Sequence, residues 1–163
     1  MRISIAAIVF GPLLSILSVC ADAGRADIGA DVVALSCHDD SLVTGDPGGN
    51  DSVAVATPTD IGAGAVVFNG ANLSICPDGD VDLFALQPKT TDTIEARVHY
   101  DPSFGRLALR LVDGGGTALA ADDSDGRVLR IRYRHDMVET LYVEVSAPDG
   151  AENNYDMQMF IAD

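Results

Sequence analysis

Apolar and polar side chains alternate along much of the second half of the chain. In residues 93–100, Ile94, Ala96, Val98 and Tyr100 fall on one side and mostly polar residues on the other. The same alternation recurs in residues 106–112, 127–134, 139–145 and 155–161. A period of two is typical of half-buried antiparallel strands, which direct one row of side chains to a core and the other to solvent.

Turn-forming residues separate these segments. They include Asp101-Pro102, Asp113–Gly116, Asp122–Gly126 and Pro148–Gly150, where glycine supplies the backbone conformations that tight turns need. Strand candidates recur about every 8–12 residues, and no stretch after residue 23 has a helical period. We therefore predict an all-β fold, a single antiparallel β-sandwich domain that is jelly-roll-like and has about eight strands.

The N-terminus has the pattern of an export signal. Arg2 precedes the apolar run 3–19, and Ala21-Asp22-Ala23 fits a signal-peptidase site, so residues 1–23 are predicted to be removed. The run is short for a membrane span, and lipid attachment at Cys20 is a minor alternative because Val19 is bulky for that signal. Residues 24–45 are then an N-terminal arm and residues 46–163 the sandwich, in a secreted protein, extracellular or periplasmic.

The chain is strongly acidic, with 25 Asp and Glu against 10 Lys and Arg and a net charge of −15. Such a balance repels nucleic acid and anionic membrane surfaces. It favours solubility and divalent cations, although a solvated acidic surface without a specific ligand has the same composition. We expect no nucleic-acid partner, no membrane span and a monomer.

Signatures of catalysis are missing from the sequence. It has no nucleophile elbow, no zinc-protease helix motif and no phosphate-binding loop, and its three histidines, His38, His99 and His135, are scattered. The prediction is that the protein is not an enzyme.

Two cysteines remain after the export signal, Cys37 and Cys76. In an oxidising compartment an even number of cysteines indicates a disulfide, and a loop of about 40 residues would stabilise the fold by roughly 4 kcal/mol in the chain-entropy model. A metal site with two cysteines is the alternative, but no further ligand spacing supports it.

Several short motifs in a fixed order resemble the bacterial pre-peptidase C-terminal domain family, whose relatives include the collagen-binding domains of bacterial collagenases. They are NDS at 50–52, DVDLF at 80–84, GRLALRLVDGGGTALAADDSDG at 105–126, LYVEV at 141–145 and NNYDM at 153–157. Cys37, Asp39-Asp40 and Cys76 match a subset of that family that carries a paired cysteine. The resemblance implies a secreted β-sandwich domain of the kind that is found next to many exported proteases.

The resemblance also implies a calcium site. Carried over by position, the candidate ligands are Asn50, Asp51, Asp80 and Asp82, whose hard oxygens suit Ca²⁺. The chain departs from the family pattern at three positions: Gly48 replaces a glutamate, Gly49 a proline and Arg106 an aspartate. The first of these removes a carboxylate. Read as an EF-hand, the stretch from Asp78 fails at the sixth and twelfth positions, Leu83 and Lys89.

Arginines gather on the polar rows of two predicted strands. Arg130, Arg132 and Arg134 share one row, and Arg106 and Arg110 lie on another segment. One interpretation is a binding face for carboxylate or sulfate groups, which the planar guanidinium suits. The other is pairing with Glu95, Glu139 and Glu144 on neighbouring strands.

These inferences lead to one functional hypothesis. The protein is predicted to be a secreted, non-catalytic β-sandwich that binds an extracellular polymer or protein, or that assists secretion or localisation. The alternative is an extracellular hydrolase or protease inhibitor with a site that no motif reveals.

Overall fold

The computed structural model describes residues 49–77 and 79–162. Every described residue belongs to one compact unit of the chain, Ala34–Asp163. The predicted export signal, the arm, Cys20 and Cys37 lie outside the described residues, as does Asp78.

The described residues form nine β-strands and no helix, which confirms the all-β prediction. Five of the strands coincide with the segments that alternate in sequence. The two-residue strand β1 brings the number to nine. The strands are β1 (Thr57–Pro58), β2 (Val67–Ile75), β3 (Val81–Leu86), β4 (Thr93–Tyr100), β5 (Ala108–Val112), β6 (Ala118–Asp122), β7 (Val128–Arg134), β8 (Leu141–Ser146) and β9 (Asn153–Ala162).

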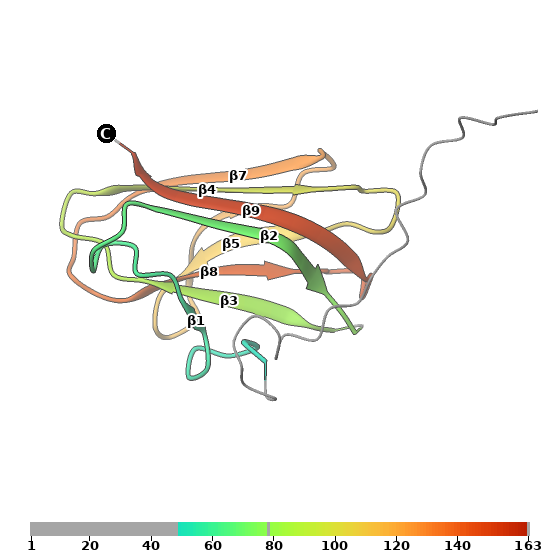
Figure 1. The fold of residues 1–163 in the computed structure, drawn as a ribbon, viewed down its shortest axis with the longest axis horizontal. Helices are drawn as coiled ribbons and strands as arrows, with labels where there is room; N and C mark the ends of the chain where they lie inside the picture. The colour runs from blue at the N-terminus through green and yellow to red at the C-terminus, as the bar shows by residue number, and fades with distance from the viewer. Residues whose placement is uncertain (1–48, 78, 163) are drawn as a thin grey trace, which may run out of the picture. The chain divides into compact units, whose positions relative to one another are not determined.

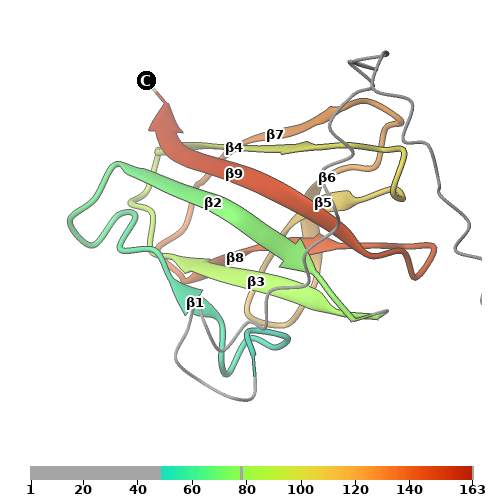
Figure 2. The same cartoon turned by 45° about the vertical axis from the view of Figure 1, so that its right-hand side comes forward.

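The strands stack in two layers (Figures 1 and 2). One sheet has the order β1-β3-β8-β5-β6 and the other β2-β9-β4-β7. All neighbours are antiparallel except β1 and β3. Consecutive strands often lie in different sheets, so most pairings join residues that are far apart in the sequence.

The core lies between the sheets and is built from the predicted inner rows. On β4 these are Ile94, Ala96, Val98 and Tyr100, all buried. Other members of the core are Phe84, Leu109, Leu111, Leu129, Ile131, Leu141, Val143, Val145, Tyr155, Met157 and Met159. Burial of these rows, at about 25 cal/mol per Å² of apolar surface, is the main favourable contribution to folding.

Strand β2 lacks simple alternation. Its first half is largely exposed, its last three residues are buried, and its register with β9 shifts between Gly70 and Leu73. Asn72 adopts a left-handed conformation, with φ of 56°, at this bulge. A bulge changes which side chains face inward, and for this reason the period of two does not reveal this strand. No helix long and apolar enough to cross a membrane occurs in the part of the chain that the structure describes.

Candidate functional site

The predicted calcium ligands Asn50, Asp51 and Asp80 come together beside β3. The Leu83 N–H donates to the Asn50 carbonyl at 3.0 Å, and Asn50 Nδ2 donates to the Leu83 carbonyl at 3.3 Å. The Asp51 carboxylate is close enough to Asp80 to raise the pKa of that residue. Segments 30 residues apart in the sequence therefore supply neighbouring oxygens.

The pKa of Asp80 is raised above its ordinary value. Burial is the main cause, and the neighbouring Asp51 carboxylate adds to it. The Cys76 N–H donates to Asp80 Oδ2 at 2.7 Å and acts in the opposite direction without offsetting the other two effects. A carboxylate that is desolvated beside a second carboxylate is a position that gains from a cation.

Asn50 contributes a buried amide oxygen. The residue is 2% exposed, and its Oδ1 accepts no hydrogen bond from the described residues. An amide oxygen and two carboxylates are the ligand types that Ca²⁺ prefers, although a site needs six to eight oxygens. Among the described residues no group of three or more His, Cys, Asp or Glu side chains is arranged to hold a metal ion. The oxygen types of Asn50, Asp51 and Asp80 therefore suit Ca²⁺, but they are fewer than a complete site needs.

Asp82, the fourth predicted ligand, faces the interior of the sandwich. Its Oδ2 accepts a hydrogen bond from the Tyr155 hydroxyl on β9, so the pair connects the two sheets. Asp82 is buried. Its part in calcium binding stays a prediction, as does the Cys37–Cys76 disulfide, because Cys37 lies outside the described residues.

A second candidate site is the outer side of the four-stranded sheet. It carries Arg97 on β4 and Arg130, Arg132 and Arg134 on β7, and we call it the arginine face. Strands β4 and β7 are neighbours, and their register sets Arg97 opposite Arg130. The three arginines of β7 are exposed, because their side chains alternate with the buried Leu129 and Ile131.

Glu95 lies beneath two of these arginines. Its Oε1 is 2.5 Å from an Arg97 nitrogen and 2.8 Å from an Arg130 nitrogen, and the residue is 2% exposed. The pKa of Glu95 is lowered, and the hydrogen bond from Arg130 is the largest cause. The hydrogen bonds from Arg130 and Arg97 together outweigh burial, which acts in the opposite direction. Arg97 also covers the Phe160 ring at 5.1 Å, a cation–π contact.

Arg132 and Arg134 have no ion pair with any residue of the described chain. Arg106 and Arg110, the other two predicted binding residues, lie elsewhere. Arg110 pairs with Glu144 at 2.9 Å in the other sheet, and Arg106 pairs with Asp125 at 2.9 Å. The structure therefore gathers three of the five predicted arginines.

Sequence reasoning named Phe160 as an aromatic residue on an outer strand face, but it did not assign Arg97 to this site. The alternation in residues 93–100 placed Arg97 on an outer row, but its neighbours depend on β4 lying between β7 and β9. Phe160 meets it from β9, 63 residues later in the chain. No local signal encodes such a pairing.

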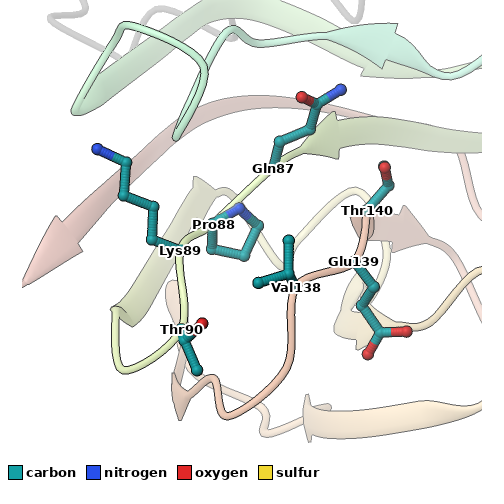
Figure 3. Close-up of a pocket in the computed structure, with 7 residues that line it drawn as sticks. All are labelled: Gln87, Pro88, Lys89, Thr90, Val138, Glu139 and Thr140. Atoms are coloured by element: carbon teal, nitrogen blue, oxygen red, sulfur yellow. The ribbon is translucent and has the colours of Figure 1, made fainter.

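A pocket of about 540 Å³ lies between the segments 87–90 and 138–140 (Figure 3). The charged ends of Lys89 and Glu139 point in opposite directions. Two threonines, Gln87, Pro88 and Val138 complete the lining. Acid–base chemistry needs titratable groups within hydrogen-bonding reach of one reacting atom, and this lining does not supply such a pair.

No family model and no curated protein sequence matches the chain. Solved structures with a similar fold include two crystal structures. The Aeromonas hydrophila protein PliG, a periplasmic inhibitor of g-type lysozyme, is 14% identical, with a TM-score of 0.51 over 66% of this chain and 96% of that one. The pre-peptidase C-terminal domain of a Bacillus anthracis collagenase is 15% identical, with a TM-score of 0.50 over 64% and 93%.

These likenesses concern the fold. They confirm, at that level, the resemblance to pre-peptidase C-terminal domains. The chain thus shares a compact two-sheet architecture with a domain of a collagenase and with an inhibitor protein. Function belongs to sites on such a fold and is argued below from the residues.

Proposed function

We propose that this protein is a secreted, non-catalytic β-sandwich that binds an extracellular polymer or protein through the arginine face. The observation that carries the proposal is a set of exposed guanidinium groups in a chain of net charge −15. Clustered arginines repel one another unless a negative charge lies nearby. Arg132 and Arg134 have no ion-pair partner in the described chain.

Pull-down tests this proposal. The purified protein is incubated with insoluble extracellular polymers and with immobilised extracellular proteins such as collagen. Binding to at least one of them is expected, with loss of binding in Arg132→Ala and retention in Arg110→Ala, which changes an arginine in the other sheet. Binding that Arg132→Ala leaves intact would contradict the role of the arginine face.

Export and a bound calcium ion complete the proposal. Residues 1–23 direct export, Cys37 and Cys76 form a disulfide, and Ca²⁺ is held by Asn50, Asp51 and Asp80, with Asp82 as a further ligand. The Asn50 Oδ1, which has no hydrogen-bond partner among the described residues, and the raised pKa of Asp80 support the calcium site. The ion would supply a positive charge that holds residues 50–51 against the start of β3. Lipid attachment at Cys20 is the alternative route of localisation.

Inhibition of an extracellular hydrolase is a second candidate function. The segment between β7 and β8 presents Met137, 58% exposed, and Val138, 81% exposed, beside the pocket. Exposed apolar side chains on a loop are a common contact of binding proteins. Loss of hydrolase inhibition in Val138→Ser, with the arginine face unchanged, would favour this function over polymer binding.

A further inference from the structure

We infer that the arginine face binds an anionic polysaccharide, a polymer that carries carboxylate or sulfate groups together with free hydroxyls. The inference rests on the proposed function and names its ligand class. It is drawn from the order of the strands, the state of each arginine and the uncharged polar groups that lie among them.

Strand register arranges the face in rows. One row runs Asn69, Gln158, Arg97, Arg130 across strands β2, β9, β4 and β7, and the next runs Val67, Phe160, Glu95, Arg132. Arg134 lies one row further along β7. Neighbouring rows are about 7 Å apart and neighbouring strands about 4.8 Å apart, so the guanidinium groups form a band along β7 and into β4.

The arginines of the band differ in how they are held. Arg97 and Arg130 share the carboxylate of Glu95, which neutralises one charge and fixes both side chains. Arg132 and Arg134 are exposed, and neither makes an ion pair within the described chain. Four arginines against one glutamate leave the band cationic, so its partner is anionic.

Uncharged polar side chains adjoin the band. Gln158 Nε2 donates to Asn69 Oδ1 at 3.0 Å, and each amide keeps further donor and acceptor capacity toward solvent. Such groups pair with hydroxyls, which donate and accept in the same way. A ligand with anionic groups and hydroxyls along one chain matches both parts of the face.

An acidic peptide fits this face less well. Extended peptides bind to sheets mainly through backbone hydrogen bonds at an open edge. Strands β4 and β9 are interior to their sheet, so their backbone groups are already paired on both sides. Strand β7 is an edge strand, and its Arg130 N–H already donates to Asp122 Oδ2 at 2.7 Å. Away from that edge the face offers side chains, and it suits a polymer whose own substituents make the contacts.

Isothermal titration with defined polymers tests the inference. The probes are dextran sulfate and polygalacturonate as anionic polysaccharides, unsulfated dextran as the neutral match, and poly-L-glutamate as the acidic peptide. The variant Arg132→Gln/Arg134→Gln is compared with Arg106→Gln/Arg110→Gln, which removes the same charge from elsewhere. Circular dichroism and thermal unfolding verify that both variants fold.

We expect both anionic polysaccharides to bind, and dextran not to bind. Affinity falls about tenfold or more in Arg132→Gln/Arg134→Gln and changes less than about twofold in the control pair. Raising NaCl from about 0.05 to about 0.5 M weakens binding, because salt screens the guanidinium charges.

Three results overturn the inference. Equal losses in the two double variants indicate attraction by overall charge. Poly-L-glutamate binding as tightly as the polysaccharides indicates an acidic protein partner. Failure of both anionic polysaccharides to bind removes the ligand class. If the protein then still binds a partner in the pull-down through Arg132, the proposed function stands without this inference; binding to no partner through Arg132 refutes both.

Discussion

Two buried carboxylates of this sandwich have pKa values shifted in opposite directions, Glu95 mainly by an arginine and Asp80 mainly by burial. Glu95 is held between the guanidinium groups of Arg97 and Arg130, which lower its pKa. Asp80 is desolvated beside Asp51, and both effects raise its pKa. At the scale of single residues, the first site is satisfied by the protein's own charges and the second is short of a positive charge.

Glu95→Gln is expected to destabilise the protein near neutral pH. The change leaves two guanidinium groups without their shared carboxylate, a cost of about 1–3 kcal/mol in free energy of unfolding. Because the pKa of Glu95 is lowered in the folded state, its contribution is complete above the ordinary value of 4.5 and is lost as the pH falls through the lower folded value. Urea unfolding at pH 7 and in acid measures both effects.

The control for this experiment is Glu139→Gln, which changes a glutamate that makes no ion pair in the described part of the chain. We expect a change of less than about 0.5 kcal/mol there. An equal loss in the two variants, or a Glu95→Gln loss that is constant down to acid pH, would contradict the assigned ion pairs.

Asp51→Asn is expected to change stability in opposite directions with and without calcium. The pKa of Asp80 is raised in the folded state. Well below the ordinary pKa of 3.8 the residue is protonated and does not destabilise the fold, whereas its ionisation destabilises the fold as the pH rises through the folded-state pKa. Removing the Asp51 charge relieves part of this cost, so in chelator at pH 7 the variant is more stable by about 0.5–1 kcal/mol.

In calcium the same variant loses a ligand. The thermal shift that Ca²⁺ gives the parent protein is expected to shrink or vanish, and Asp149→Asn, in an exposed turn, keeps it. Thermal unfolding with and without Ca²⁺ measures the effect. A parent protein that Ca²⁺ does not stabilise would remove the calcium proposal.

At the scale of elements, a tight turn between β1 and β2 lies against the end of β3. Gln87 N–H donates to the Ile61 carbonyl at 2.8 Å, which ties the turn to the end of β3. Gly62 has φ of 84°, and a Cβ there would lie 1.8 Å from the Gln87 carbonyl oxygen. The turn therefore needs glycine at this position for both its backbone conformation and its space.

Gly62→Ala is expected to lower the free energy of unfolding by about 2–4 kcal/mol, since the backbone of β3 must move away. Gly64→Ala is the matched control, because nothing lies within 4 Å of its Cβ position. Denaturant unfolding of the two variants gives the comparison. Equal stabilities would show that this turn does not pack against Gln87 as described.

Strands were predictable where buried and polar side chains alternate over the whole length of the strand. Strands β4, β7, β8 and β9 have a buried row and a polar row, and the period of two identified each of them. Strand β2 was not identified, because its bulge interrupts the alternation. Strand β6 is a short, partly exposed edge strand whose alanines give no contrast between the rows.

At the scale of the whole molecule, the two outer faces of the sandwich differ in charge balance. Arg110 on the five-stranded sheet is matched by Glu144, whereas the arginine face retains unpaired guanidinium groups within the described chain. A protein of net charge −15 therefore has a local surface of the opposite sign. This asymmetry is what supports a binding role for one face.

A disulfide between Cys37 and Cys76 is the prediction at this scale. It would tie the N-terminal arm to the start of the sandwich, and its reduction is expected to lower stability by up to about 4 kcal/mol. Peptide mapping without reductant should recover one joined pair. Cys76→Ser should abolish the effect of reductant on thermal unfolding. Two free thiols in the exported protein would refute the pairing.

The sequence by itself determined the class of fold and the inner rows of five strands, because alternation is a local property of the chain. The calcium ligands Asn50, Asp51, Asp80 and Asp82, which the family resemblance implies, stay a prediction. Only the tertiary structure decided which residues meet. It set Arg97 over Phe160 and buried Glu95 between Arg97 and Arg130, because strands distant in sequence are adjacent in the sheet. Pairing and register follow from packing the whole core at once, and no short stretch of residues contains that information.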